Sequence, residues 1–424
     1  MGKIPDDWSI SDLASELVLL KDGTHNPPKR VQKGIRFIAG ASDIKYHDVD
    51  FTNCTFISEV DYKQIHRYYQ IQANDVLLTI VGTIGNAAIV KRSDLPFSLQ
   101  RSIAILRSGV RLHYDYLFYW LVSPRFKQML SSTINPTAQP GIYLKELGKL
   151  KIPLPSLTEQ AAIAKILSDL DSKIELNNQM NATLEAMAQA IFKHWFIDFE
   201  FPDENGKPYK SSGGKMVDSE FGGVPEGWHI SKVGKELQTV LGGTPSTRKK
   251  EYWTNGDIPW INSGKVNEFR IIEPSAYITK DALDSSATKL MPKGTTVIAI
   301  TGATLGQVSI IESEMCGNQS VIGIIHNKSI SPEYIYFWIK THITELISNQ
   351  TGGAQQHINK DNVNSLDLLV PLDYIMKCFI EKIRPIFNQI SNNCSESLNL
   401  SKIRDTILPK LMSGQIRVPL EVAK

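Results

Sequence analysis

Cysteine is scarce in this chain: four occur in 424 residues, and no two of them form a C-x-x-C pair. This argues against a zinc ribbon or a thiol redox motif, and such scattered cysteines fit a reducing cytoplasm. No apolar run approaches the roughly 20 residues that a membrane span needs. The opening residues MGKIPDDWSI lack an apolar stretch, so we expect no secretory signal and a cytoplasmic protein without membrane contact.

An excess of one charge is missing as well. The net charge is +2 and the isoelectric point is about 8.1, so only local clusters of basic residues can indicate a nucleic-acid partner. Motifs of nucleotide-driven and metal enzymes are also absent. The phrase GGTPSTRKK lacks the G-K-[ST] ending of a phosphate-binding loop, and the histidines are too scattered to predict a metal site.

One phrase keeps an enzyme alternative open. His25 to Arg30 read HNPPKR, and Asn-Pro-Pro followed by an aromatic residue is the catalytic motif of amino-methyltransferases. Here Lys29 stands in place of the aromatic residue, and no Gly-rich cofactor loop precedes the phrase. A turn is therefore the favoured interpretation. The alternative is an adenine-N6 DNA methyltransferase that acts through Asn26, Pro27 and Pro28.

What the chain does contain is a repeat, and long-period repeats decide domain organisation. IPDDWSISDLASEL at Ile4 matches VPEGWHISKVGKEL at Val224. Further matches follow in the same order, pairing Asn74 with Gly294, Asp115 with Glu333, and Ala138 with Ala354. The offset drifts only from 220 to 216 residues, which is too long a period for a solenoid. We therefore interpret the chain as two copies of one unit, each a globular domain followed by a long helix.

Each globular copy is predicted to be α+β. DVLLTIVG and TTVIAITG are β-branched runs that end in glycine, as buried strands do, and SIAILRSG and SVIGIIHN are further strands. Helical periodicity follows in both copies, with Pro124 as an interruption in the first. The predicted boundaries are a domain at 1–155, a helix at 156–200, a linker at 201–220, a domain at 221–371, and a helix with a tail at 372–424.

The helix from Leu157 to Phe196 contains neither glycine nor proline, and Thr158 is its expected N-cap. Heptad positions a and d are expected to form its buried stripe, with Leu184 buried and Glu185 exposed, and Ile174, Ala188 and Trp195 at e are expected to widen it. The a residues are Ile163, Leu170, Asn177, Leu184 and Ile191, and the d residues are Ile166, Lys173, Met180, Met187 and His194. In the second long helix, Pro385 predicts a kink or a late start, and Gly414 a C-terminal cap.

Asn177 and Asn393 occupy the same heptad position in the two long helices. Either each Asn is partly solvated at a widened seam, or the helices pair antiparallel, which brings both level and lets them fix the register. Antiparallel pairing gives a coiled-coil spacer of about 55–60 Å between two globular domains, with internal pseudo-two-fold symmetry. Objects with that symmetry and two reading heads suit split sites on duplex DNA.

Over essentially its whole length, the sequence resembles the specificity (S) subunit of type I restriction-modification enzymes. The stretch from Leu154 to Phe201 looks like the family's central conserved region, GGTPSTRKKEYWTNGDIPWI like the opening of a target-recognition domain, and TILPKLMSGQI like the C-terminal conserved region. One departure is the first copy's loop KDGTHNPPKRVQKGIRFI, which is shorter than its counterpart.

The resemblance implies two target-recognition domains, each reading one half of a bipartite site in double-stranded DNA. It also implies helices that dock methyltransferase (M) subunits, through which restriction (R) subunits join. The chain itself is then non-catalytic and needs no cofactor. S-adenosylmethionine is expected in the M partner, and ATP and magnesium in the R partner.

Basic and amide-rich loops at equivalent places in the repeat are the candidate DNA contacts. Lys and Arg suit phosphates, and Gln can pair with adenine through two hydrogen bonds. The candidates in the first copy are Lys29, Arg30, Lys33, Gln100, Arg101 and Gln139. Those in the second copy are Thr244, Ser246, Arg248, Lys249, Lys250, Gln319, Gln355, Gln356 and His357. The alternatives are solvated surface, loops packed on the sheet, and a scaffold that binds protein and not DNA.

Overall fold

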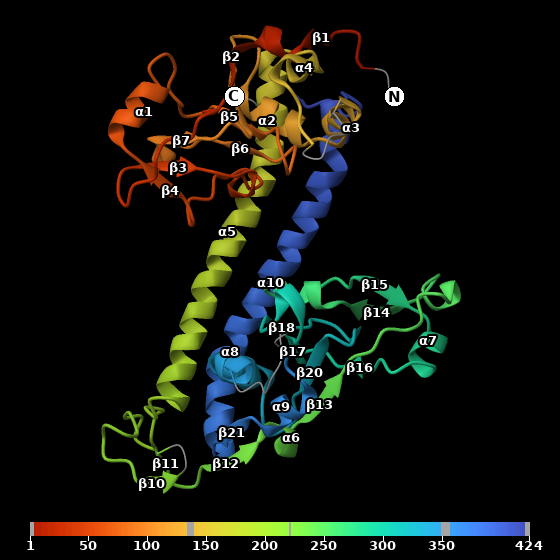
Figure 1. Ribbon diagram of the computed structural model, residues 1–424. Helices are drawn as coiled ribbons and strands as arrows, with labels where there is room; N and C mark the ends of the chain where they lie inside the picture. Colours follow the sequence, from red (N-terminus) through yellow and green to blue (C-terminus); the bar gives the residue numbers. More distant parts are fainter. Residues whose placement is uncertain (1–3, 134–139, 220–221, 349–356, 420–424) are drawn as a thin grey trace. The chain divides into compact units, whose positions relative to one another are not determined.

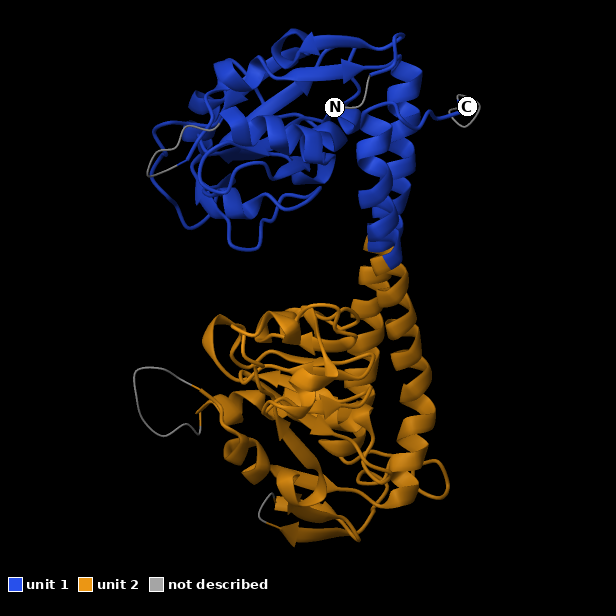
Figure 2. Ribbon diagram, turned by 90° about the vertical axis from the view of Figure 1, so that its right-hand side faces the viewer, with its two compact units in different colours: residues 1–174, 399–424 blue, residues 175–398 orange. Residues whose placement is uncertain are grey.

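The computed structural model describes residues 4–133, 140–219, 222–348 and 357–419 (Figure 1). The chain forms two compact units (Figure 2). Unit 1 contains residues 1–174 and 399–424, and unit 2 contains residues 175–398. Each unit therefore combines one globular domain with parts of both long helices.

The globular domain of unit 1 is built on two sheets. A four-stranded antiparallel sheet has the order β2-β8-β5-β6, and a three-stranded sheet has the order β4-β3-β7. Their bounds are Leu17–Asp22, Ile103–Ser108, Val76–Thr79 and Ala87–Ile89 for the first sheet, and Thr55–Ile57, Ile35–Ile38 and Phe97–Leu99 for the second. A separate pair joins β1 (Ser9–Asp12) to β9 (Lys151–Leu154).

Strand β5 explains why these runs read as continuously apolar. Val76 and Leu78 belong to the core that α2 (Tyr114–Val122) covers, whereas Leu77 belongs to a second core that includes Ile38 and Phe97. Successive side chains of a strand point to opposite faces, so a strand that is covered on both faces needs no polar positions. The remaining helices of this domain are α1 (Glu59–Ile65), α3 (Pro124–Thr133) and α4 (Leu144–Gly148).

The globular domain of unit 2 repeats this plan. Its sheets have the orders β13-β20-β17-β18 and β15-β14-β19-β16. Their bounds are Gln238–Leu241, Val321–Ile325, Thr296–Ala299 and Val308–Ile310 for the first, and Ala276–Ile278, Ile258–Ile261, Met315–Gly317 and Leu290–Met291 for the second. The other strands are β10 (Met216–Ser219), β11 (Gly222–Pro225), β12 (His229–Lys232) and β21 (Asp367–Val370). The helices are α6 (Val233–Glu236), α7 (Lys280–Asp284), α8 (Pro332–Ser348) and α9 (Lys360–Ser365).

The expected strands and the internal repeat are confirmed. The runs predicted as strands contain β5, β8, β17 and β20. The sheets β2-β8-β5-β6 and β13-β20-β17-β18, one from each domain, have the same connectivity. Pro124 interrupts the first helical run as predicted, because α2 ends at Val122 and α3 begins at Pro124. The second copy has no proline at that place, and α8 runs unbroken from Pro332 to Ser348.

The two long helices, α5 (Leu157–Phe196) and α10 (Asp373–Met412), each have 40 residues and run antiparallel side by side. In unit 1, Asp171 of α5 pairs with Arg404 of α10. In unit 2, Phe196 near the end of α5 packs on Phe379 near the start of α10, with ring centroids 4.8 Å apart. These contacts confirm the predicted antiparallel pairing within each unit.

Two details of the long helices differ from the sequence-based expectation, and a third is confirmed. The N-cap is Ser156 and not Thr158, because the Ser156 hydroxyl accepts from the amide of Glu159 at 3.2 Å. Helix α10 continues through Pro385 and Pro409 without a late start. Pro385 is exposed, so water can bind the backbone carbonyl that loses its partner there. Gly414 has φ +71°, which confirms its role as the C-terminal cap.

The buried stripe of α5 agrees with the prediction at e positions and differs from it at d positions. Ala188 and Trp195 at e are 0% and 4% exposed, whereas the predicted d residues Met180 and Met187 are 37% and 51% exposed. Leu184 is only half-buried. Glu185 is not exposed, because it accepts hydrogen bonds from Tyr336 and Lys340 of α8. The globular domain covers one flank of the helix, a contact that heptad counting within one helix does not include.

Asn177 and Asn393 are both buried, at 0% and 3% exposure. The Asn177 amide donates to Glu396 at 2.9 Å and to Ser397 at 3.2 Å on the opposite helix. The Asn393 amide donates to Asn181 at 2.9 Å. This geometry disagrees with the partly solvated alternative, because each asparagine finds its partners across the helix pair.

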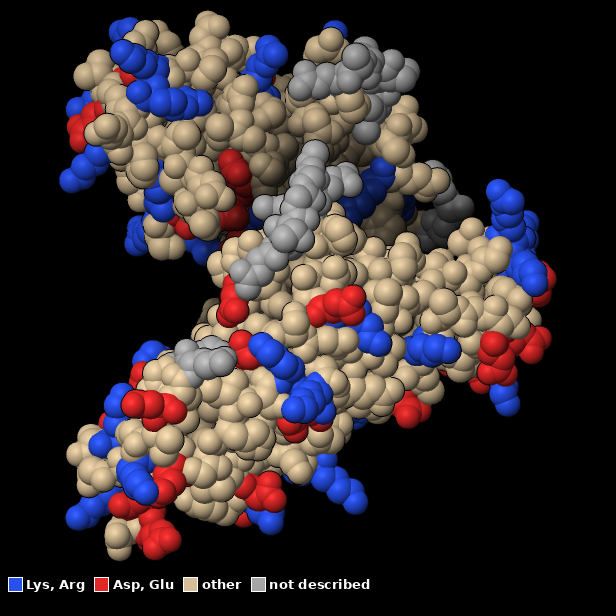
Figure 3. Space-filling model, turned by 60° about the horizontal axis from the view of Figure 1, so that its bottom comes forward, with Lys and Arg blue, Asp and Glu red and all other residues tan. Residues whose placement is uncertain are grey.

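Figure 3 shows Lys and Arg interspersed with Asp and Glu on the face that it draws. This mixture agrees with the net charge of +2 for the whole chain. A binding site for an anion on that face must therefore depend on particular loops. Within the described part of the chain, no helix is long and apolar enough to span a membrane.

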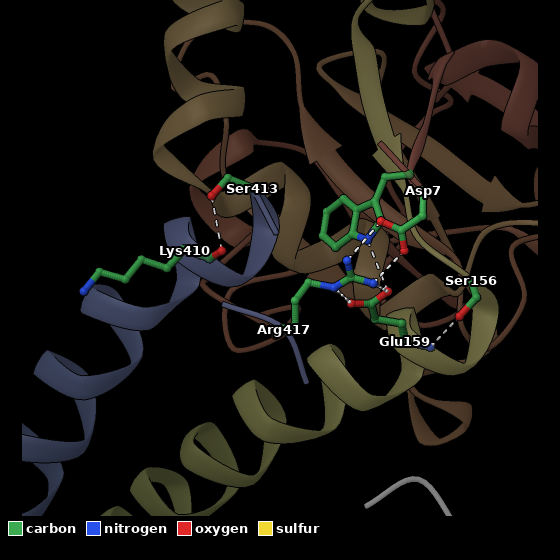
Figure 4. Close-up of polar contacts among 7 residues, drawn as sticks. Asp7, Ser156, Glu159, Lys410, Ser413 and Arg417 are labelled. Atoms are coloured by element: carbon green, nitrogen blue, oxygen red, sulfur yellow. Dashed lines mark hydrogen bonds and ion pairs between the residues drawn. The ribbon is translucent and has the colours of Figure 1, made fainter. Parts of the chain in front are cut away.

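The C-terminal tail closes unit 1 through an ionic cluster (Figure 4). The Arg417 guanidinium donates to Glu159 at 2.7 Å and to both carboxylate oxygens of Asp7, at 3.0 and 2.7 Å. Trp8 donates to the same Glu159 carboxylate. The bond to Arg417 also lowers the pKa of Asp7. The first and last described segments of the chain are thereby joined to the start of α5.

Unit 2 closes the equivalent place with aromatic rings. Trp228, the repeat partner of Trp8, stacks on Phe201 with centroids 5.0 Å apart. Phe196 packs on the same indole at 5.7 Å. Both units thus keep the tryptophan, but unit 1 surrounds it with ion pairs and unit 2 with aromatic rings. Because salt screens ion pairs, we expect high salt to weaken these contacts in unit 1 and not in unit 2.

The buried His66 makes the first domain sensitive to acid. Burial lowers its pKa from an ordinary 6.5 to about 4, and its Nε2 lies 3.0 Å from the Ser98 hydroxyl. A lowered pKa gives a stability contribution that is present above about pH 6.5 and is lost as the pH falls toward 4. We expect His66→Gln to flatten the fall in unfolding temperature over this window. The exposed His25→Gln is the control, and parallel curves for wild type and His66→Gln would contradict this assignment.

Candidate nucleic-acid interface

In the first domain, the loop after β2 lies against the turn after β7. The amide of Thr24 donates to the Leu99 carbonyl at 2.9 Å, and the amide of Arg101 donates to the Thr24 carbonyl at 3.1 Å. A Cβ on Gly23 would lie 2.2 Å from the Leu99 carbonyl oxygen, so only glycine fits this crossing. The candidates on the HNPPKR loop and the pair Gln100 and Arg101 are therefore brought together, although about 70 residues separate them in the sequence.

A glycine-rich turn after β5 lies next to the turn after β7. The Ile80 amide donates to the Ser102 carbonyl at 2.8 Å, and the Ile142 amide donates to the Ile80 carbonyl at 3.0 Å. Residues 23–33, 81–85, 100–102 and 140–142 thus form one surface, which we name the first loop edge. Gln139 lies outside the described residues.

The second domain builds an equivalent surface from equivalent segments. The Gly243 amide donates to the Gly317 carbonyl at 2.8 Å, and the Thr244 hydroxyl bonds to the Gln319 side chain. The Ile300 amide donates to Ser320, and the Ile358 amide donates to Ile300, both at 3.0 Å. Residues 242–253, 301–306, 318–320 and 357–358 form this second loop edge. His357 lies on it and is exposed, whereas Gln355 and Gln356 lie outside the described residues.

Aromatic side chains hold the basic loop of the second edge. The Trp260 indole donates to the Gly243 carbonyl at 3.1 Å, and the Trp253 indole donates to the Ser246 carbonyl at 3.3 Å. The two rings meet edge to face at 5.1 Å. Lys249 bonds to the Tyr252 hydroxyl at 2.9 Å, which raises the pKa of the lysine and lowers that of the tyrosine. The loop is therefore fixed by buried rings while its cations stay at the surface.

The cations on the two edges fall into two groups. Arg30 stacks on Phe37 at 4.0 Å and donates to the Pro28 carbonyl, so part of its role is structural. The second group is exposed and has no carboxylate partner within the described residues. Its members are Lys29, Lys33, Arg101, Arg248 and Lys250. Exposed cations without an internal partner keep their charge available to phosphate oxygens.

Asn26 of the HNPPKR loop is exposed, and its backbone carbonyl accepts from the Thr24 hydroxyl at 3.1 Å. The phrase bends at His25 and Asn26 and continues as an irregular loop. The described residues contain no group of three or more side chains that could hold a metal ion. The chemistry on the edges is that of cations, amides and hydroxyls. Asn177 and Asn393 do not belong to either edge, since they lie inside the helix pair.

The glycine-rich turns were missed as site residues in the sequence. Gly82 and Gly302 have φ +78° and +69°, and a Cβ on either would meet no atom within 4 Å. These turns are open, so a ligand backbone can approach them closely. The signal was visible as VGTIG and TGATLG at matching places in the repeat, but we assigned both phrases only to strand ends.

Comparisons with known proteins agree with this architecture. The model of the type I restriction modification DNA specificity domain matches residues 31–186 and again residues 225–400. The type I restriction enzyme MjaIX specificity subunit of Methanocaldococcus jannaschii is 26% identical over 347 residues, which cover 81% of this chain and 78% of that protein. The putative MjaX specificity subunit of the same organism is 26% identical over 432 residues, covering 99% and 96%.

A solved structure shares the fold. The type I restriction-modification S subunit from M. genitalium superposes with a TM-score of 0.59 at 16% identity, and the match covers 97% of each chain. Two specificity domains that together span most of the sequence, and relatives that match over 78% and 96% of their length, confirm the resemblance found in the sequence. The chain therefore belongs to the family of type I restriction-modification DNA specificity proteins.

Proposed function

We propose that this chain reads a bipartite target in double-stranded DNA, with one globular domain on each half-site. The observation that carries the proposal is the duplicated loop edge, in which the same four segments meet in both domains. Two copies of one surface on a single chain suit a target with two separate halves. In this proposal the chain is the non-catalytic specificity subunit of a larger modification and restriction complex.

Each loop edge offers two kinds of contact to DNA. Exposed cations such as Arg101 and Arg248 are placed to neutralise phosphates, and this contact does not depend on base sequence. The side-chain amides of Gln100, next to Arg101 in the chain, and of Gln319, which bonds to Thr244 on the second loop edge, can read base edges in the major groove. Differences between the first and second loop edges would then give two different half-sequences.

The helix pair serves two roles in the proposal. Asn177 and Asn393 bond across the pair and fix its register, so the helices act as a ruler between the half-sites. In unit 2, Leu176, Met180 and Met187 form an exposed apolar row on α5. Such a row on a surface helix fits docking of an M subunit, through which R subunits join.

The proposal is tested by the salt dependence of DNA binding. In the chain assembled with its M subunits, we expect Arg248→Gln with Lys250→Gln to lower the slope of log affinity against log salt concentration by about 2, close to one per lost phosphate contact. The matched control is Lys235→Gln with Lys328→Gln, two exposed lysines near the other end of β20. An unchanged slope would remove these cations from the interface, and wild-type binding without salt dependence would favour a protein scaffold.

A further inference from the structure

In unit 1, a single carboxylate ties the globular domain to both long helices. Asp171 of α5 accepts hydrogen bonds from the Tyr46 hydroxyl at 3.0 Å and from the Tyr119 hydroxyl at 2.7 Å. It also accepts from the Arg404 guanidinium of α10 at 2.6 Å. Tyr46 follows the 3-10 helix η2 (Ala41–Asp43), which comes after β3, and Tyr119 lies on α2. We name these four residues the Asp171 cluster.

The ion pair at the centre of the Asp171 cluster is largely shielded from water, whereas Tyr46 at its rim is 44% exposed. The side chains of Asp171 and Arg404 are only 12% and 16% exposed. Burial and the neighbouring carboxylate raise the pKa of Tyr46 and of Tyr119, so both hydroxyls remain protonated donors at any physiological pH. The guanidinium also lies over the Tyr46 ring at 4.8 Å. Short charge-assisted bonds in such a site hold a narrow geometry.

Unit 2 has a cluster at the corresponding place, made from different side chains. Arg270 follows the 3-10 helix η5 (Ser263–Asn267), which comes after β14. Its guanidinium lies 4.8 Å from the Tyr336 ring and 4.9 Å from the Phe387 ring. Glu312, 3.7 Å from Arg270, accepts from the Ser391 hydroxyl of α10 at 2.8 Å. These five residues form the Arg270 cluster. The helix residue Phe387 stands 216 positions after Asp171, which is the repeat offset of the long helices.

In both units, an equivalent loop connects the globular domain to the long helices, but its contacts differ. This loop carries Tyr46 in unit 1 and Arg270 in unit 2. In unit 1 the loop brings His47 against Phe118 of α2 at 4.8 Å, and in unit 2 it brings Arg270 against Tyr336, the repeat partner of Phe118. If only packing were needed, apolar residues would serve at lower desolvation cost than a buried arginine. A polar cluster at the same place in both units indicates that the orientation of the globular domain on the helices is constrained there.

Apolar cores hold each domain on the helices, and directional polar bonds, such as those to Glu159 at the start of α5, add to them. In unit 1 the shared core uses Ile163 and Leu167 of α5 and Leu408 of α10. Hydrophobic contact is non-directional, so a domain held by it alone can pivot. Asp171 lies one helical turn beyond Leu167, at the edge of this contact. A directional bond at the edge of an apolar contact opposes the pivot.

We propose that the Asp171 and Arg270 clusters set the angle of each recognition domain on its helix pair, and thereby how strictly the complex selects the spacer between the half-sites. Asp171 is then a positioning residue that touches no DNA. The inference rests on the proposed function, since a spacer exists only if two half-sites are read.

The test compares Asp171→Asn with Asp169→Asn in the chain assembled with its M subunits. Asp169 lies on the same helix, but its side chain is 63% exposed and pairs only with Lys165. Methylation of a DNA library with variable spacers gives the half-sequences and the spacer preference separately. For Asp171→Asn we expect unchanged half-sequences and a loss of about tenfold in preference for the native spacer over its neighbours, the size of one bond to a buried charge. Asp169→Asn is expected to match wild type.

Two further measurements keep the test decisive. Hydrogen exchange at residues 43–47 should be faster in Asp171→Asn than in Asp169→Asn, whether or not DNA is bound. Tyr46→Phe removes a single hydroxyl, so it should fold and shift the spacer preference in the same direction if Asp171→Asn fails to assemble. A native spacer preference in both variants, or altered half-sequences, would overturn the inference alone. A wild-type complex that methylates no split target would overturn the proposed function as well.

Discussion

Replacing residues 221–371 with the equivalent stretch of a relative is expected to change one half of the methylated target and to leave the other half and the spacer unchanged. The reason is that the second loop edge lies entirely within this stretch. The first loop edge belongs to unit 1 and keeps its contacts. We would read the target by sequencing the methylated sites in cells that express the hybrid with its M subunits.

The structure makes this exchange feasible. Strands β12 and β21 pair antiparallel, with His229 opposite Val370, so the chain enters and leaves this globular domain on two adjacent strands. The donor must keep aromatic residues at Tyr334 and Phe337 of α8, because both rings pack on Phe192 of α5 at about 5.5 Å. A hybrid that lacks them would lose a core contact and not only a recognition surface.

The reciprocal exchange of residues 1–155 is the control for this experiment. It should change the other half-sequence and preserve the one that the first hybrid altered. If either hybrid changes both halves, the two domains do not read independently. If only the spacer changes, the loop edges are not the reading surfaces, and the contacts of Gln100 and Gln319 would have to be assigned to folding.

The globular domains were predictable because their strands are buried on both faces. A run such as residues 76–79 is buried at every position and carries only one polar residue, Thr79, and its repeat at 296–299 doubles the signal. The convergence of each loop edge was only partly predictable. Matching places in the repeat singled out the HNPPKR loop and Gln100 separately, but their contact depends on how β2 and β7 lie in the sheets, which no local pattern encodes.

The errors in the buried stripe of α5 share one physical cause. Heptad positions describe how a helix meets another helix, but α5 and α10 also meet globular domains. Glu185 looked like a solvated position and instead binds Tyr336, 151 residues away in the sequence. Asp171 was not singled out, because its partners Tyr46 and Arg404 are 125 and 233 residues distant. Contacts of such separation follow from the tertiary fold and leave no trace in a window of one helix.

Inserting four residues after Asn181 is expected to preserve both half-sequences while the tolerated spacer lengthens or the activity falls. Four residues add about 6 Å of helix, close to two base-pair steps, and turn the following segment by about 40° beyond a full turn. The insertion falls where Asn181 bonds to Asn393, so the local register of the pair is disturbed. Methylation of a library with variable spacers would measure the outcome.

A second variant separates length from register. Inserting four residues in α10 as well, after Asn393, lengthens both helices at the same level and leaves no unpaired segment to loop out. This double insertion should shift the preferred spacer by about two base pairs with a smaller loss of activity than the single insertion, because the seam closes again on both sides. If either variant kept the original spacer at full activity, the helices would not measure the DNA. The asparagines at 177 and 393 would then stabilise the pair without setting the distance between half-sites.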